Sequence, residues 1–312
     1  MRQMLLTAAA AASFVLPAHA GEPAEIPSPG EIAAAAPARD WVPIAPSDLL
    51  VMDLAPGAAG EPRRVVIQLM PPPFSQGWIA NIRKLAAAHW WDGTSVTRVQ
   101  DNYVAQWGDP TEKKPLPAGL AVVSENDYVM RGDAPRWQRF SNLLIPHSDI
   151  QRYTSFEAGW PVAAEGTPDS ARRWPVHCYG MVGVGRNMSP DTGSGAELYA
   201  VIGHAPRHLD RNIALVGRVV SGIEHLSSLP RGSEALGFYK DEAERVPITS
   251  IRLATELPAA GQPKFEYLST DSESFAKYAD ARANRRDPFF IRPAGGADIC
   301  NIPVPVRAVA AK

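Results

Sequence analysis

The chain has 312 residues, of which 30 are proline and 24 are glycine, and its formal net charge at pH 7 is −2. This length exceeds that of a typical domain, but so much proline and glycine predicts many loops and extended connections. We therefore expect one elaborated domain rather than two complete cores. The sequence has no basic block long enough to grip a phosphate backbone, which argues against a nucleic-acid partner.

The first twenty residues have the features of a secretory signal peptide. They contain one positive charge at Arg2, an apolar stretch over Met4–Leu16, and a small-residue pattern over Ala18–Ala20, which together are typical of a cleaved leader. The alternative is a membrane anchor, but the apolar stretch is shorter than the roughly 20 residues that span a bilayer. We therefore expect cleavage after Ala20 and an exported protein without stable membrane insertion.

The first elements after the leader are predicted from local patterns. Residues 21–46 are rich in alanine and proline and lack periodicity, so we expect a flexible or partly extended lead-in. Two apolar runs over 48–54 and 63–70 are bounded by proline and glycine and predict the first two strands. A helix is predicted over 74–89, where apolar residues recur at helical spacing and Ser75 is available as an N-cap. The apolar residues of this helix are Ile79, Ile82, Leu85 and Ala86.

Most of the later elements are predicted to be short strands. Apolar or alternating runs predict strands at 92–99, 102–107, 176–185, 197–203, 213–220 and 248–255. A second helix is predicted over 220–229, and a further one over 272–284 in the C-terminal tail. Many short strands, two packed helices and no regular strand-helix alternation indicate a mainly β protein, with a closed antiparallel β-barrel capped by two helices.

A long inserted loop region, about 111–175, separates the early strands from the later ones. It contains several tryptophans, including Trp137 and Trp160. So many aromatic side chains are costly to leave in water. We therefore expect the insertion to be partly ordered, and to pack on the barrel or to cover part of a groove.

Four segments in order give the chain a family resemblance. The stretch over 92–110 places Arg98 inside an alternating strand pattern, and it is followed by GVGR at 183–186, AELYAVIG at 196–203 and LDRNIALVGRVVSG at 209–222. Together these segments resemble the cyclophilin-type peptidyl-prolyl cis-trans isomerases. The resemblance implies the cyclophilin barrel, with an isomerase domain over 47–256. A C-terminal extension over 257–312 and the insertion then mark a divergent member.

The resemblance also implies a reaction that needs no nucleophile, metal or cofactor. The barrier to rotation about a prolyl amide, about 18–20 kcal/mol, comes from carbon–nitrogen resonance. In the twisted state the prolyl nitrogen regains a lone pair, so a fixed donor binds that state more strongly than the planar state and lowers the barrier. The resemblance gives this role to Arg98, whose guanidinium is rigid and always charged. It gives Gln106 the role of binding the substrate backbone carbonyl and steadying the guanidinium.

The resemblance further implies an apolar pocket for the proline ring. Its expected substrate-binding residues, besides Gln106, are Tyr103, Val104, Glu197, Leu198, Tyr199, His208, Leu209 and Ile213. Glu197 stands where the family has a neutral amide, and it would either compete with substrate for Arg98 or orient the arginine. Tyr199 adds a hydroxyl that needs a partner when buried. His208 stands where many members have tryptophan, which implies weak cyclosporin binding.

Together with the leader, these features predict an exported, periplasmic peptidyl-prolyl isomerase that acts on proline-containing unfolded or flexible polypeptides. The alternative is a catalytically weak cyclophilin-like chaperone or assembly factor, which the altered sequence at 196–199 favours. An open groove at Arg98 and Gln106 would support the enzyme, and a groove filled by Trp137 and Trp160 would support the alternative. The sequence does not predict the client proteins or the oligomeric state.

Two further features leave the function unchanged. The cysteines Cys178 and Cys300 would form a disulfide between the domain and the C-terminal extension in an oxidising compartment, or remain buried thiols. The sequence leaves both alternatives open. The DTGS motif at 191–194 supplies one of the two carboxylates that an aspartic protease needs, so we interpret it as a glycine-rich loop.

Overall fold

The structure of the chain is a computed structural model that describes residues 26–111, 113–131, 150–151, 153–166 and 170–309. The predicted signal peptide and Trp137 lie outside the described residues. Within the part of the chain that the structure describes, no helix has both the length and the hydropathy to cross a membrane.

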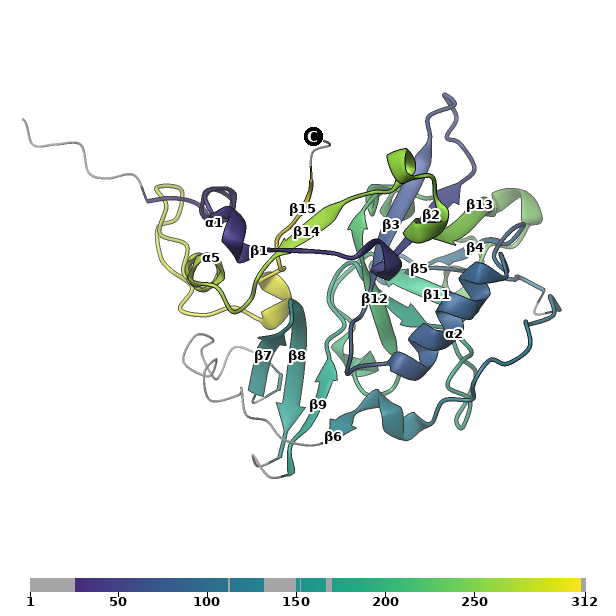
Figure 1. Ribbon diagram of the computed structural model, residues 1–312, viewed down its shortest axis with the longest axis horizontal. Helices are drawn as coiled ribbons and strands as arrows, with labels where there is room; N and C mark the ends of the chain where they lie inside the picture. The colour runs from purple at the N-terminus through teal and green to yellow at the C-terminus, as the bar shows by residue number, and fades with distance from the viewer. Residues whose placement is uncertain (1–25, 112, 132–149, 152, 167–169, 310–312) are drawn as a thin grey trace, which may run out of the picture.

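Eight antiparallel strands close into a barrel in the order β10-β11-β5-β4-β13-β2-β3-β12 (Figure 1). They are β2 (Leu49–Leu54), β3 (Arg63–Leu69), β4 (Ser95–Val99), β5 (Val104–Gly108), β10 (Met181–Val184), β11 (Leu198–Val201), β12 (Leu215–Ser221) and β13 (Val246–Leu253). The structure therefore confirms the predicted mainly β class and the closed antiparallel barrel.

Strand β2 is apolar on both faces because both faces are covered. Its alternate residues Leu50 and Met52 belong to the main core inside the barrel, since successive side chains of a strand point to opposite sides. The residues between them, Leu49 and Val51, belong to a second cluster that includes Phe265 from the C-terminal extension. The nearly continuous apolar run of this strand thus reflects packing of the extension on the outside of the barrel.

Two helices pack on the barrel, and both differ in detail from their predicted form. Helix α2 (Gln76–Ala87) buries the predicted apolar face. Ser75 does not cap this helix through its side chain, because its backbone is left-handed, with φ 56°. Helix α4 (Glu224–Ser227) is a single turn, shorter than the predicted 220–229. Strand β12 continues to Ser221 in its ladder with β3, which leaves little chain for the helix.

The lead-in is more regular than predicted. Its helix α1 (Pro29–Ala34) begins with a capping box between Ser28 and Glu31. Strand β1 (Trp41–Pro43) follows and pairs with a strand of the C-terminal extension. Helix α1 thus departs from the expected flexible or partly extended segment, whereas β1 is extended. Both elements are short and find their partners more than 200 residues along the chain, so local periodicity does not reveal them.

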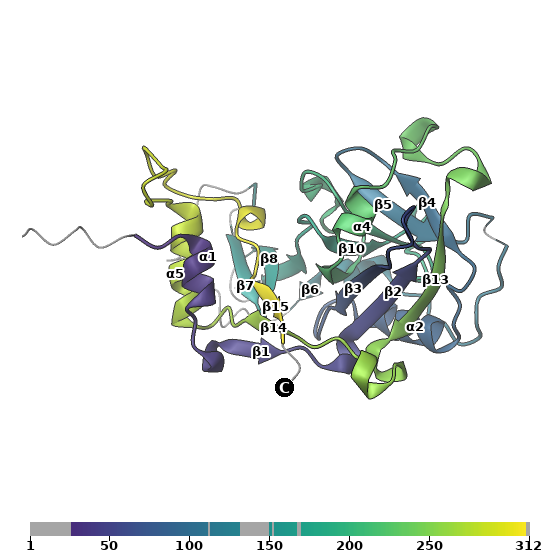
Figure 2. The ribbon, with the colours of Figure 1, turned by 90° about the horizontal axis from the view of Figure 1, so that it is seen from above.

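The lead-in and the C-terminal extension form one unit. Strand β14 (Phe265–Leu268) lies between β1 and β15 (Val306–Ala308) in a three-stranded sheet. Helix α5 (Glu273–Ala283), predicted over 272–284, is capped by Ser272. It lies beside α1 on the side of the molecule away from the barrel (Figure 2).

The insertion contributes a four-stranded sheet in the order β6-β9-β8-β7. Its strands are β6 (Met130–Arg131), β7 (Tyr153–Glu157), β8 (Trp160–Glu165) and β9 (Arg172–Pro175). Phe156 of β7 contacts the ring of Phe275 in α5 at a centroid distance of 4.9 Å. Before the sheet, Tyr128 stacks on Trp78 of α2 at 5.3 Å. The insertion thus packs on both the barrel helix and the extension, as its aromatic content predicts.

Candidate functional site

Arg98 lies on β4, where three hydrogen bonds hold its guanidinium. Nε donates to the carbonyl oxygen of Leu236 over 2.7 Å, and Nη1 donates to Gln106 Oε1 over 2.9 Å. Nη2 donates to Gln100 Oε1. A guanidinium has five N–H donors, so each terminal nitrogen keeps one N–H without a partner among the described residues.

Burial and aromatic contacts set the charge state of this arginine. Its Cζ atom lies 5.6 Å from the ring centroid of Tyr103 and 5.2 Å from that of Phe238. Burial lowers the pKa of Arg98 below its ordinary value, while the charges of Tyr103 and Glu197 act to raise it. Because the pKa of a guanidinium starts far above neutrality, the site holds a fixed cation.

Gln106 and Glu197 extend the network that begins at Arg98. Gln106 lies on β5 directly opposite Arg98 on β4, and its Nε2 donates to Glu197 Oε1 over 2.6 Å. An ionised carboxylate can only accept hydrogen bonds, so Glu197 turns the amide nitrogen of Gln106 toward itself and the amide oxygen toward Arg98. Glu197 is thus linked to Arg98 through Gln106.

Five of the predicted pocket residues form an apolar cluster separate from the main core. They are Tyr103, Val104, Tyr199, Leu209 and Ile213, and Val201 joins them. Val104 and Tyr199 are buried, whereas the other predicted members are partly exposed, so the cluster has a buried floor and an accessible rim. The imidazole of His208 stacks on Tyr103 with centroids 6.2 Å apart, which places it at this rim.

Leu198 is not part of this cluster, which corrects the expectation that it lines the pocket. It lies in the main core and is 1% exposed, because adjacent residues of β11 face opposite sides and Tyr199 faces the cluster. Gly183 lies opposite Tyr199 in the ladder between β10 and β11. A Cβ at this glycine would lie 2.3 Å from Cζ and Oη of Tyr199, so the glycine of the GVGR motif makes room for the tyrosine ring.

The segment 232–239 borders the Arg98 site, and nothing in the sequence pattern indicated this. Leu236 supplies the carbonyl oxygen for Nε, and Phe238 supplies one of the flanking rings. Gly237 has φ +81°, and a Cβ there would lie 2.6 Å from Cα of Gln100. The glycine therefore lets this segment approach the end of β4 closely, but one glycine in a loop is too weak a signal to find from sequence.

A buried chain of polar groups begins at the Tyr199 hydroxyl and was also missed. Tyr199 Oη lies 3.0 Å from His177 Nε2, and His177 Nδ1 lies 2.9 Å from Asp210 Oδ1. Asp210 also accepts from the backbone N–H of His177 over 3.0 Å and from Arg207 Nε over 2.7 Å. Since the carboxylate can only accept, Nδ1 carries the imidazole proton, Nε2 is the acceptor, and Tyr199 donates to it.

Burial keeps the first two groups of this chain neutral. It lowers the pKa of His177 below its ordinary value, against the raising effect of the hydrogen bond to Asp210. Burial also raises the pKa of the Tyr199 hydroxyl well above its ordinary value. A neutral imidazole and an un-ionised phenol are the two states that the hydrogen bond between them requires.

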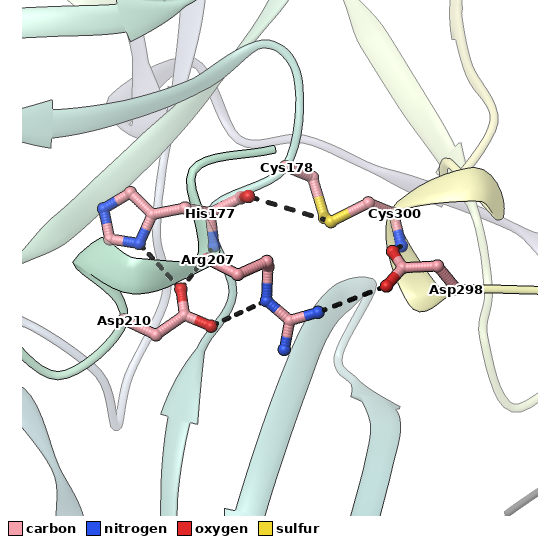
Figure 3. Close-up of a disulfide and its surroundings, with 6 residues drawn as sticks. All are labelled: His177, Cys178, Arg207, Asp210, Asp298 and Cys300. Atoms are coloured by element: carbon pink, nitrogen blue, oxygen red, sulfur yellow. Dashed lines mark hydrogen bonds and ion pairs between the residues drawn. A yellow bond between two sulfur atoms is a disulfide. The ribbon is translucent and has the colours of Figure 1, made fainter. Parts of the chain in front are cut away.

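A disulfide brings the C-terminal extension to this polar chain (Figure 3). Cys178, the residue after His177, is bonded to Cys300, with the two Cα atoms 5.1 Å apart. Asp298 accepts the backbone N–H of Cys300 over 2.8 Å, and its other carboxylate oxygen lies 3.5 Å from Nη1 of Arg207. The C-terminal extension therefore contacts this network of polar groups at two points, beside His177 and at Arg207, which binds Asp210.

The predicted alternative of a filled groove finds no support in the described residues. Trp160 is buried on β8, where Cζ of Arg218 lies 4.5 Å from the centre of its ring. The rings beside Arg98 are instead those of Tyr103 and Phe238. In the described ranges, no three His, Cys, Asp or Glu residues are grouped so that they could hold a metal ion.

Comparisons with known proteins agree with this fold. The family model described as cyclophilin type peptidyl-prolyl cis-trans isomerase/CLD matches residues 77–253. The crystal structure of the cyclophilin AquaCyp293 from Hirschia baltica shares the fold, with 21% identity and a TM-score of 0.64, over 87% of this chain and 94% of that chain.

Weaker likenesses add nothing to this result. A cyclophilin type peptidyl-prolyl cis-trans isomerase from Cryptosporidium parvum is 13% identical over 66% of this chain and 96% of that chain, with a TM-score of 0.37. The same protein in the presence of the dipeptide Ala-Pro gives 13% identity over 65% and 98%, with a TM-score of 0.36. No curated protein matches the chain.

Proposed function

Because the chain belongs to the family of cyclophilin type peptidyl-prolyl cis-trans isomerases, whose model matches more than half of its residues, we propose that Arg98 carries out the isomerisation. Family membership makes the chain a peptidyl-prolyl isomerase. The observation that supports the role of Arg98 is a charged guanidinium, fixed by three hydrogen bonds, that keeps one donor on each terminal nitrogen beside an apolar cluster.

Arg98 acts by binding the twisted amide more strongly than the planar one. In the planar ground state the lone pair of the prolyl nitrogen is delocalised into the carbonyl, and it accepts hydrogen bonds poorly. Rotation localises the lone pair, and a donor of Arg98 then binds the nitrogen. A donor that is already in place costs no reorganisation at that moment, so its full effect lowers the barrier.

The apolar cluster and Gln106 hold the substrate while it rotates. The proline ring packs against the buried floor formed by Tyr199 and Val104, which fixes the ring and leaves the acyl side of the amide to turn. Gln106 uses its oxygen for Arg98 and one N–H for Glu197. Its second N–H has no partner among the described residues and donates to a backbone carbonyl of the substrate.

The substrates are X-Pro bonds in unfolded or flexible polypeptides outside the cytoplasm, in a periplasm. The signal-peptide pattern of the first twenty residues supports export. The disulfide between Cys178 and Cys300 suits an oxidising compartment. Uncatalysed prolyl isomerisation takes tens to hundreds of seconds and limits folding, so exported proteins that fold there benefit from a catalyst.

A protease-coupled isomerisation assay on the chain without its first twenty residues tests this proposal. We expect Arg98→Ala to lower kcat/KM by roughly 100- to 1000-fold, as expected for loss of a donor aimed at the transition state. Arg64→Ala is the matched control, because Arg64 pairs with Asp53 on the barrel surface, and it should leave kcat/KM unchanged. Full activity of Arg98→Ala would overturn the assigned role.

A further inference from the structure

A buried network of polar groups links the Tyr199 hydroxyl through His177 to Asp210, and Figure 3 shows where the C-terminal extension meets this network. We infer that His177 is a positioning residue that holds the Tyr199 ring as the floor of the pocket, and that the extension keeps His177 in place through Cys300 and Asp298. This inference rests on the proposed function, because it takes the cluster around Tyr199 as the seat of the proline ring.

The Tyr199 hydroxyl needs a partner at the bottom of the pocket. The side chain is 4% exposed, and a buried hydroxyl without a hydrogen bond is costly. His177 Nε2 supplies the acceptor, 3.0 Å from Tyr199 Oη. Without that acceptor the phenol would have to turn toward water, and the accessible water lies at the rim formed by the partly exposed members of the cluster. The ring would then leave the floor on which the proline packs.

Asp210 and Arg207 make His177 a reliable acceptor. Nε2 can accept only while Nδ1 holds the proton, and the bond from Nδ1 to Asp210 fixes that tautomer. Asp210 and His177 have side-chain exposures of 2% and 1%, and that of Arg207 is 8%. A buried carboxylate is stable only when paired, so Arg207 in turn holds Asp210. None of these three residues contacts the reacting amide, so their effect on catalysis passes through Tyr199.

The C-terminal extension contacts this arrangement at two points, beside His177 and at Arg207. Its short 3-10 helix, Ile299–Asn301, carries Cys300 and is capped by Asp298. Ile299 and Ile302 are 1% and 0% exposed in the main core, so the helix is firmly seated. From this seat, Cys300 holds the residue after His177, and Asp298 holds Arg207. The extension lies beyond residue 253, where the family match ends, yet it supports the floor of the pocket.

A double-mutant cycle tests the role of His177. His177→Leu should raise KM about tenfold and change kcat less than about twofold, because it leaves the Tyr199 hydroxyl unpaired beneath the substrate. Tyr199→Phe should change KM less than about threefold, because the floor stays apolar. The double variant should then resemble Tyr199→Phe, because removing both partners leaves no hydroxyl to turn into the pocket.

A purely structural role gives a different result. The double variant would then be at least as impaired as His177→Leu, and the loss would appear as a smaller fraction of folded protein, with KM unchanged. Tyr278→Phe is the matched control, since it removes a buried tyrosine hydroxyl that donates to the carbonyl of Pro303 in the extension, and it should leave KM unchanged. An unchanged KM in folded His177→Leu overturns the inference.

Reduction of the disulfide tests the part played by the extension and needs no variant of His177. Reducing the wild type with dithiothreitol should raise KM several-fold, and the same treatment of Tyr199→Phe should not change KM, because that variant has no hydroxyl to position. Equal effects on both proteins, or none on either, overturn the role of the extension. These outcomes are distinct from failure of the proposed function, in which Arg98→Ala keeps full activity whatever the state of His177.

Discussion

The candidate site has a polar end at Arg98 and Gln106, and a buried end at Tyr199 and His177. The two ends are built in different ways. Arg98 and Gln106 face each other across one hairpin, eight residues apart in sequence. At the Tyr199 hydroxyl, the partner is His177, which precedes Cys178 in the sequence. Cys178 is bonded to Cys300, which lies 122 residues further along. The barrel therefore fixes Arg98, which we propose acts on the amide, while the C-terminal extension contacts the polar groups behind Tyr199, on which we propose the proline rests. The two ends should consequently fail separately, one through kcat and the other through KM.

The largest effect is expected at the polar end, from Arg98→Lys. This variant keeps the positive charge but loses the fork that holds Gln106, Gln100 and Leu236 while leaving a donor for the substrate. We expect kcat/KM to fall by roughly 100-fold, mainly through kcat. The coupled isomerisation assay with full progress curves separates the two constants. If lysine restores most of the activity that Arg98→Ala loses, charge alone is sufficient and the fixed geometry is not needed.

A smaller effect is expected from Glu197, which orients Gln106. Glu197→Ala frees the amide of Gln106 to turn its nitrogen toward Arg98, and we expect kcat/KM to fall about tenfold. Glu197→Gln keeps an acceptor at this position, so its effect should be less than about threefold. Glu61→Ala removes an exposed carboxylate and is the control. A rise in kcat/KM for Glu197→Ala would mean that the acid competes with substrate for the arginine.

The smallest effect is expected at the buried end, in the way the free energy of unfolding depends on pH. The pKa of His177 is lowered in the folded protein, so near and below its ordinary value of about 6.5 the unfolded chain binds a proton that the native protein does not. The free energy of unfolding should therefore fall as the pH drops below that value, until the folded pKa is reached. The other ionisable groups near the imidazole are Asp210, Arg207 and His208.

Urea unfolding at about pH 7 and about pH 5, followed by tryptophan fluorescence, measures this effect. The double variant His177→Leu/Tyr199→Phe keeps all three of these ionisable neighbours but lacks the imidazole of His177, so its free energy of unfolding should fall less over the same interval. An equal fall in both proteins would show that His177 does not titrate as its burial implies.

The sequence predicts most of the barrel because the barrel depends on local alternation. The strands and helix α2 follow from periodicity, and the ordered motifs point to Tyr103 and Tyr199, which lie in one apolar cluster. Leu198 was placed on the wrong side because a motif match gives position along a strand but not the face. Strand β1 was missed because it depends on β14, more than 200 residues away.

The residues that support the site were not predicted from the sequence, again because their partners lie far away along the chain. His177 carries no motif, and its role appears only when β11 and the loop containing Asp210 place it between two polar partners. Phe238 is one aromatic residue in an irregular segment, and its contact with Arg98 depends on the close approach of Gly237. Residues that face the substrate are thus readable in the motif, whereas those that hold them come from distant segments.

A crystal structure of the protein with a short peptide containing Ala-Pro tests the central claim most directly. We predict that the proline ring lies on Tyr199 within the apolar cluster, and that an N–H of Arg98 points at the prolyl nitrogen while Gln106 donates to a backbone carbonyl. A peptide bound elsewhere, or one whose proline lies in the cluster with the Arg98 donors turned away from the amide, would contradict the account.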